Sequence, residues 1–360
     1  MIVVTHATKS LGLCDRLVVM GRGGVLCFQG SPDEARKFFG GESYDDIYPL
    51  LEERDPRDWQ RQFAEGRDPV APPGGSNGAR PAQRARRVRS SIVHQTRVLT
   101  SRYARLFTRD RRNMFILLGQ VPILGLAIAG LFKISVFTRP SSDAGQAVKL
   151  TFLLLVTTVW IGMIDASREI IKEKGVFTRE NSVGVRLSAY LLSKAIVLFT
   201  LAAIQALILT GIVLLFQPLH AHLDVYAAVL IIVVLTAFAS VSMGLLVSAA
   251  VRNQDQATSF IPLILIPQLF FGGSIVATAT MSAPLRAITK IVVTQWSYAG
   301  LGAAIDMNGR IAESPNYSKV STFGHHYFTL SRGSTYLILA AFIAVFFLLI
   351  AWTLKRRARA

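Results

Sequence analysis

The chain has 360 residues, of which 51% are hydrophobic and only 17% are charged. That balance excludes an ordinary soluble domain and predicts an integral membrane protein. The net charge of +17 would suit a nucleic-acid-binding protein, but the basic residues cluster beside apolar segments. Anionic lipid headgroups and membrane topology explain that clustering. We therefore predict membrane lipids, and no nucleic acid, as partners.

Residues 1–66 have the pattern of a small α/β unit. A β-branched run opens the chain, and two further short strands are predicted over residues 15–20 and 24–29, around a glycine-rich turn. Ser31, Pro32 and Glu34 then supply an N-cap, a first-turn proline and a capping-box acid for a helix. Three short strands bury too little apolar surface to fold alone, so we interpret this unit as the tail of a larger domain.

A linker and a basic helix are expected next. Residues 67–89 are rich in Pro, Gly and Arg, which is typical of a flexible linker. Residues 90–112 are predicted to form a helix with many arginines. It is either an ordinary solvated helix or an interfacial helix along the lipid headgroups. Arginines directly before the first apolar segment favour the interfacial helix.

Residues 113–360 are predicted to form a mainly α, six-span membrane domain. Each of six apolar segments is long enough to cross a bilayer. They cover residues 113–132, 148–166, 189–216, 225–251, 257–280 and 335–354. Lys and Arg gather at alternate ends of these segments, which places both termini in the cytosol of a plasma-membrane protein.

A charged connector, residues 168–188, separates the second and third apolar segments. It is far longer than a hairpin between two helices needs, and its charges require water on the cytosolic side. We interpret it as a short helix that presses on a soluble partner; a solvated loop that only fixes topology is the alternative. The contact candidates are Glu169, Lys172, Glu173, Arg179 and Glu180.

The opening stretch VVTHATKSLGLCDRLVVMGRGGVLCFQGSP resembles the C-terminal end of an ABC-transporter nucleotide-binding domain. The resemblance implies that His6 is the switch histidine, a catalytic residue that contacts the γ-phosphate of ATP; a structural histidine is the alternative. The 360 residues contain no GxxxxGK[ST] loop, no Walker B acid and no LSGGQ-like signature. We therefore expect no ATP hydrolysis by this chain alone. ATP and Mg²⁺ would bind only with a complete nucleotide-binding domain, either upstream in a longer protein or in a partner.

Three stretches of the membrane part resemble ABC exporter permeases of the ABCG (white) type: EKGVFTRENSVGVRLSAYLLSKAIV, RNQDQATSFIPLILIPQLFFGG and QWSYAGLGAAIDMNG. The resemblance implies that the connector is a coupling helix that transmits ATP-driven closure. It also implies that two permease subunits, as a homodimer, enclose an apolar cavity lined by their second and fifth spans. Phe270 and Phe271 would line that cavity, unless they only pack helices together, and lipidic or amphipathic cargo would suit it.

Two other functions are weaker hypotheses. A non-transporting membrane scaffold would use its vestigial soluble piece to dock a partner. A membrane-embedded metalloenzyme would need its paired histidines, residues 220 and 222 or 325 and 326, but these lack clustered acids or cysteines, and we predict no metal site. The spans are nearly free of charge. Asp165 and Lys194 lie near the predicted cytosolic ends, and Lys149 and Asp224 near the predicted outer ends, so we expect that all four can reach water by snorkelling.

Overall fold

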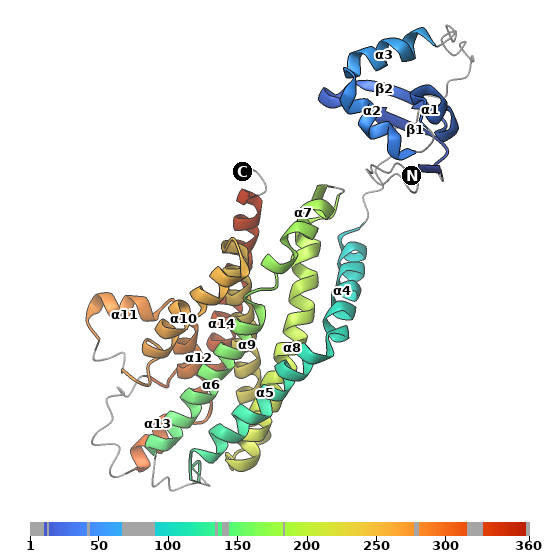
Figure 1. Cartoon of the computed structure of the whole chain (residues 1–360). Helices are drawn as coiled ribbons and strands as arrows, with labels where there is room; N and C mark the ends of the chain where they lie inside the picture. Colours follow the sequence, from blue (N-terminus) through green and yellow to red (C-terminus); the bar gives the residue numbers. More distant parts are fainter. Residues whose placement is uncertain are drawn as a thin grey trace. The chain divides into compact units, whose positions relative to one another are not determined.

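The computed structural model describes residues 11–12, 14–41, 44–66, 91–133, 136–138, 144–182, 184–276, 281–314 and 327–357. The chain divides into two compact units, Met1–Val88 and Arg89–Ala360, and each is described by itself (Figure 1). His6, the predicted linker over residues 67–89, and His325 and His326 lie outside the described residues.

The first unit contains the predicted hairpin. Strands β1 (Leu17–Met20) and β2 (Leu26–Gly30) pair antiparallel, with Leu17 opposite Gly30. Between them Gly23 and Gly24 both have positive φ, of 77° and 76°, which glycine adopts without steric cost. The two strands expected over residues 15–20 and 24–29 are confirmed.

Three helices cover this hairpin, and the first carries the predicted cap. The helices are α1 (Pro32–Phe39), α2 (Ile47–Glu53) and α3 (Pro56–Glu65). The backbone N–H of Ser31 donates to Glu34 Oε2 at 2.7 Å, and the N–H of Glu34 donates to Ser31 Oγ at 3.3 Å. Aromatic rings fill the space beneath: Phe39 lies 4.9 Å from Trp59 and 5.9 Å from Phe28, measured between ring centroids. The capping box is confirmed.

The second unit is a bundle of long helices, with the short helix α7 near one end and α11, α12 and α13 along its side (Figure 1). Its long helices are α4 (Ile92–Arg109), α5 (Arg111–Gly130), α6 (Ala144–Ala166), α8 (Leu187–Phe216), α9 (Leu223–Ala250), α10 (Gln254–Phe270) and α14 (Arg332–Arg357). Its shorter helices are α7 (Lys174–Ser182), α11 (Ala283–Thr289), α12 (Val293–Ala304) and α13 (Met307–Glu313).

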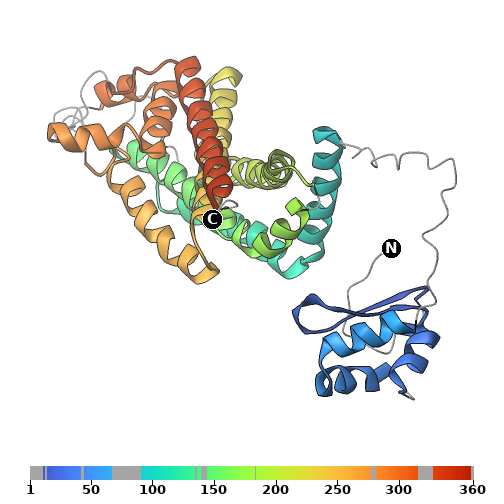
Figure 2. The same ribbon diagram turned by 90° about the horizontal axis from the view of Figure 1, so that it is seen from above.

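Helix α9 is the centre of the bundle and packs against α6, α8, α12 and α14; Figure 2 shows α14 beside it from above. The contact with α6 is close because small residues line it. A Cβ on Gly244 would lie 2.5 Å from the carbonyl oxygen of Met163, so any larger residue would push the helices apart. Small residues at a helix crossing let membrane helices pack tightly.

Five of the six predicted spans are present among the described residues as helices long and apolar enough to cross a membrane: α5, α6, α8, α9 and α14. The fifth predicted segment, residues 257–280, contains α10, which has 17 residues and ends at Phe270. Pro262 and Pro267 lie inside this helix and remove two backbone donors. Residues 277–280 lie outside the described residues, so the fifth span stays a prediction.

At the end of the bundle opposite the connector, which we predict to be the outer end, two buried polar side chains bind backbone groups of neighbouring segments. Gln217 Nε2 donates to the carbonyls of Lys133, at 3.0 Å, and of Phe132 and Ala129, both at 3.4 Å. Arg310 is 4% exposed and donates to the carbonyls of Ile305 and Phe137, at 3.0 and 2.6 Å. These contacts fix the end of α5 and the start of α13.

Candidate functional site

The connector leaves α6, makes a 3₁₀ turn over Ile171–Glu173 and continues as α7, as the sequence predicted. Its first residues are held by α9, where Ser248 Oγ accepts from the backbone N–H groups of Ile170 and Ile171, at 2.9 and 3.0 Å. The connector is therefore attached to the core of the bundle at the point where it leaves α6.

Helix α4 holds the far end of the connector through one amide side chain. Gln95 Nε2 donates to the carbonyl of Gly184 at 3.2 Å, and its Oε1 accepts from the backbone N–H of Arg186 at 3.0 Å. Gly184 has φ of 106°, a conformation that favours glycine, and it turns the chain from α7 into α8. The position of this turn is thus fixed to α4.

A buried ionic cluster joins α4, the connector and α8. Lys194 of α8 is 1% exposed, and its Nζ lies 2.9 Å from Glu173 Oε2 and 3.7 Å from Glu169 Oε2. Tyr103 of α4 donates its hydroxyl to Glu169 Oε2 at 2.5 Å, and Lys194 Nζ lies 3.4 Å from the centroid of the Tyr103 ring. Burial raises the pKa of Tyr103, and the nearby Glu169 carboxylate raises it further, so the hydroxyl stays a donor. We name these four side chains the ionic joint.

A second ion pair lies between α4 and α7. Arg102 donates from both terminal nitrogens to Glu180, with Nη2 at 3.2 Å from Oε2. The hydrogen bond from Arg102 to Glu180 raises the pKa of the guanidinium. This pair is partly exposed, with 41% of the arginine side chain and 22% of the glutamate accessible, so solvent screens it more than the ionic joint.

The acidic and basic side chains of the connector differ in their contacts and exposure. Glu169, Glu173 and Glu180 all bind side chains of α4 or α8. The exposed side chains of the connector include four basic ones: Arg168, Lys172, Lys174 and Arg179. We name these four the basic face. Of the five predicted contact residues, Lys172 and Arg179 therefore lie on the exposed surface, and the three glutamates pair with side chains of α4 or α8.

The two predicted cavity residues lie at the end of α10. Phe270 is its last residue and is 48% exposed, and Phe271 follows as the C-cap and is half-buried. No structural contact tests their predicted role in a cargo cavity, which stays a prediction. The histidines at 220 and 222 lie between α8 and α9. In the part of the chain that the structure describes, no three His, Cys, Asp or Glu side chains gather at a site for a metal ion.

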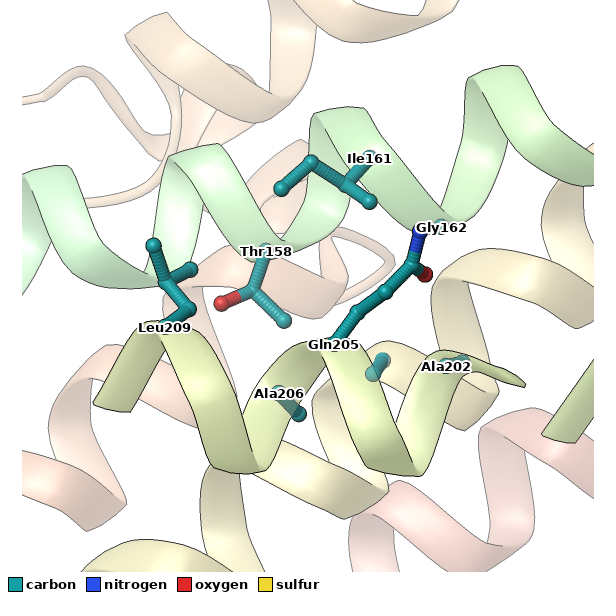
Figure 3. A pocket seen from close by; sticks show the side chains of 8 residues that line it. Thr158, Ile161, Gly162, Ala202, Gln205, Ala206 and Leu209 are labelled. Carbon is teal, nitrogen blue, oxygen red and sulfur yellow. The ribbon is translucent and has the colours of Figure 1, made fainter. Parts of the chain in front are cut away.

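A small cavity lies between α6, α8 and α9, with room for about one water molecule, so it is too small for cargo. Figure 3 shows Gln205 reaching across it from α8 toward Gly162 of α6. The lining residues are Thr158, Ile161, Gly162, Ala202, Gln205, Ala206, Leu209 and Ala237.

The expectation that Asp165 and Lys194 snorkel to water is wrong. Asp165 Oδ2 accepts from Gln205 Nε2 at 2.8 Å, inside the bundle, and Lys194 is the buried centre of the ionic joint. Both residues lie near helix ends that the sequence predicts to be cytosolic, but α4 and the connector cover Lys194, and α8 supplies a partner for Asp165. The position of each residue in the sequence indicated its depth in the bundle only approximately. It did not show which neighbouring segments cover the side chain.

Sequence reasoning also missed the residues of α4 that hold the connector. Gln95, Arg102 and Tyr103 are separated from their partners by 66 to 91 positions. A polar stripe with a spacing of seven to eight residues on an otherwise basic helix was the available signal. The stripe indicates one polar face on α4 but not the segment that the face contacts.

Two comparisons with known proteins agree with this architecture. Residues 94–305 match the family model described as ABC-2 type transporter. The chain is also similar to the ABC transporter ATP-binding/permease protein Rv1747 of Mycobacterium tuberculosis, with 28% identity over 319 residues. That alignment covers 85% of this chain and 36% of the relative, so the chain spans about a third of the length of the protein that it matches.

Proposed function

This chain belongs to the ABC-2 type transporter family, and from that premise we propose that it is the membrane subunit of an ATP-driven exporter of the ABCG type. In this proposal the connector receives the force of ATP-driven closure. The chain has six spans, both termini are cytosolic, it lies in the plasma membrane and it works as a homodimer. Lipidic or amphipathic cargo fits an apolar pathway near Phe270 and Phe271.

The observation that carries this proposal is the construction of the connector. A topology signal alone needs only positive charge on the cytosolic side. This connector in addition buries its acids against Lys194, Tyr103 and Arg102, which ties it to α4 and α8. A force applied to the connector is therefore applied to both helices at once.

The basic face is the proposed docking surface for the ATPase. Its four exposed side chains suit a partner surface that presents carboxylates. The relative is named as both ATP-binding and permease, which supports an ATPase in the same assembly. ATP and Mg²⁺ would be held by a complete nucleotide-binding domain, to which His6 would contribute if residues 1–66 are its C-terminal part. The 360 residues contain no phosphate-binding loop, so no step of ATP hydrolysis is assigned to them.

The test separates docking from transmission in the complete transporter, reconstituted in vesicles with a fluorescent phospholipid analogue. Reversing the exposed charge in Lys172→Glu should weaken assembly with the ATPase domain. Reversing the buried charge in Glu173→Lys should leave assembly intact but lower the lipid exported per ATP hydrolysed. Lys290→Glu, an exposed change at a site distant from the connector in sequence, is the control.

Two results would overturn the proposal. Export per ATP that is unchanged in Glu173→Lys would remove the transmitting role of the connector. Assembly with an ATPase but no export of any tested cargo in the unmodified protein would favour the membrane scaffold instead.

A further inference from the structure

Asp165 has a hydrogen-bonding environment that the transport proposal does not use. Its Oδ2 accepts from Gln205 Nε2 at 2.8 Å, and the same nitrogen donates to the carbonyl of Leu117 at 3.0 Å. The amide side chain of Gln120 on α5 also lies beside the carboxyl group. One carboxyl group at the end of α6 thus connects α6 with α5 and α8.

This carboxyl group lies inside the bundle, about one helical turn from Glu169 of the ionic joint, and its Oδ1 atom is buried. Its partner Gln205 follows Lys194 by eleven residues and precedes Gln217 by twelve, which corresponds to about 17 and 18 Å along α8. Gln205 therefore lies midway between the ionic joint and the contacts at the outer end. An ionised carboxylate at such a depth is costly unless a cation or a proton compensates it.

None of the packed helices supplies that cation. From Asn113 to Gly130 in α5, Ala195 to Phe216 in α8 and Ala227 to Ala250 in α9, the sequence contains no ionisable residue. The nearest charged groups belong to the ionic joint: Glu169, one turn along from Asp165, already shares Lys194 with Glu173. Arg168 is next to Glu169 but its side chain is exposed.

Two acceptor atoms at this position have no hydrogen-bond donor among the described residues. They are Asp165 Oδ1 and Gln205 Oε1, and both are buried. Gln205 is 3% exposed and lines the small cavity, which it crosses toward α6 (Figure 3). A carboxylate supplies no donor, whereas a carboxylic acid supplies one O–H. One proton on Asp165 therefore provides the donor that this pair of side chains lacks.

We propose that Asp165 is a proton-binding site within the bundle. The carboxylate takes a proton from a hydronium ion, which leaves water, and the new O–H lies on Oδ1, where Gln205 Oε1 or a cavity water accepts it. Charge balances because the negative carboxylate becomes neutral. The site therefore takes a proton; a sodium ion held by the same oxygens is the competing outcome of the test.

The link between protonation of Asp165 and the transport cycle rests on the proposed function. Because α6 runs directly into the connector, a movement of the connector changes the contacts of Asp165, and protonation would follow the transport cycle. The binding of the proton itself needs no transport. If the connector proved not to transmit force, the proton site would still stand or fall on its own measurement.

The experiment uses the unmodified full chain in lipid nanodiscs. A hydrophobic carbodiimide reacts with protonated carboxyl groups in apolar surroundings, and mass spectrometry locates the product. Asp165 is only partly exposed, and we expect modification at Asp165 at mildly acidic pH, with loss of labelling as the pH rises. The exposed Asp255 is the internal control and should stay unmodified. Asp165→Asn, which keeps an amide that can bond with Gln205, should remove the labelled peptide and an infrared carboxylic-acid absorption of the protein.

Three results would overturn the proposal. The first is no modification of Asp165 at any pH at which the protein is folded. The second is an infrared carboxylic-acid band of equal intensity in the unmodified protein and in Asp165→Asn. The third is labelling that falls when sodium replaces potassium at constant pH, because it would assign the site to the sodium ion.

Discussion

Among the described residues, a buried ionic cluster is found at one end of the helix bundle and not at the other, and side chains bind backbone groups at both ends. At the connector, charged side chains bind one another: Lys194 with Glu173 and Glu169, and Arg102 with Glu180. At the outer end, Gln217 and Arg310 bind backbone carbonyls. In a pair of side chains both members can rotate to new partners, whereas a side chain bound to a backbone carbonyl has a partner that the helix or turn holds in place. We therefore expect the connector end to rearrange and the outer end to serve as a fixed anchor.

The largest expected effect is at the centre of the ionic joint. Lys194→Met would leave Glu169 and Glu173 without their buried cation, and breaking a buried pair by removing one partner costs about 3–5 kcal/mol. The measurement is the free energy of unfolding in detergent. Lys172→Met removes the same charge from an exposed side chain and should change that free energy by less than about 0.5 kcal/mol.

The double variant Lys194→Met with Glu173→Gln sharpens this prediction. Neutralising Glu173 removes one of the two uncompensated charges, so part of the lost stability should return. Equal stability of the Lys194→Met and Lys172→Met proteins would mean that the ionic joint does not hold the connector.

A smaller effect is expected at the outer anchor. Gln217→Leu would leave carbonyls at the end of α5 without their donor, which costs about 1–3 kcal/mol for buried polar groups. Stability should fall while lipid export per ATP hydrolysed stays at its original value, because the anchor does not transmit force. Gln254→Leu, at an exposed position, is the matched control. A fall in export per ATP, with stability unchanged, would reverse the assignment of the two ends.

The smallest effect is expected at the partly exposed pair. A double-mutant cycle with Arg102→Glu and Glu180→Arg should give a coupling free energy of about 0.2–1 kcal/mol, which falls as salt concentration rises. The charge-swapped double variant should recover most of the stability that each single variant loses. Additive losses in the double variant would show that the two side chains do not interact in solution.

Local sequence signals predicted much of this fold. The hairpin around Gly23 and Gly24, the capping box of Ser31 and Glu34, and the helix in the connector depend on neighbours within a few residues, and all are present. Five of the expected spans are also present among the described residues, because length and hydropathy alone decide them. The fold class follows from such short-range information.

The candidate site could be predicted only in part, because its contacts are long-range. The charge pattern identified the connector, but it could not show that Glu173 faces Lys194 while Lys172 faces outward. Nor did it pair Asp165 with Gln205, which lies forty positions later. A single sequence shows which residues share one face of a helix, but it does not show which other segment that face contacts. The extent of α10 also differs from the expected segment, because the helix ends at Phe270, where a turn follows.

The most direct test of the account is the labelling of a single cysteine in the connector of the complete transporter. Lys174→Cys in a Cys14→Ser background, with the fully buried Cys27 retained, is exposed to a membrane-impermeant maleimide in sealed vesicles. If the connector is cytosolic and docks the ATPase domain, the cysteine is labelled from the cytosolic side only, and more slowly once the ATPase domain is bound. Labelling from the outside, or a rate that ATPase binding leaves unchanged, would contradict it.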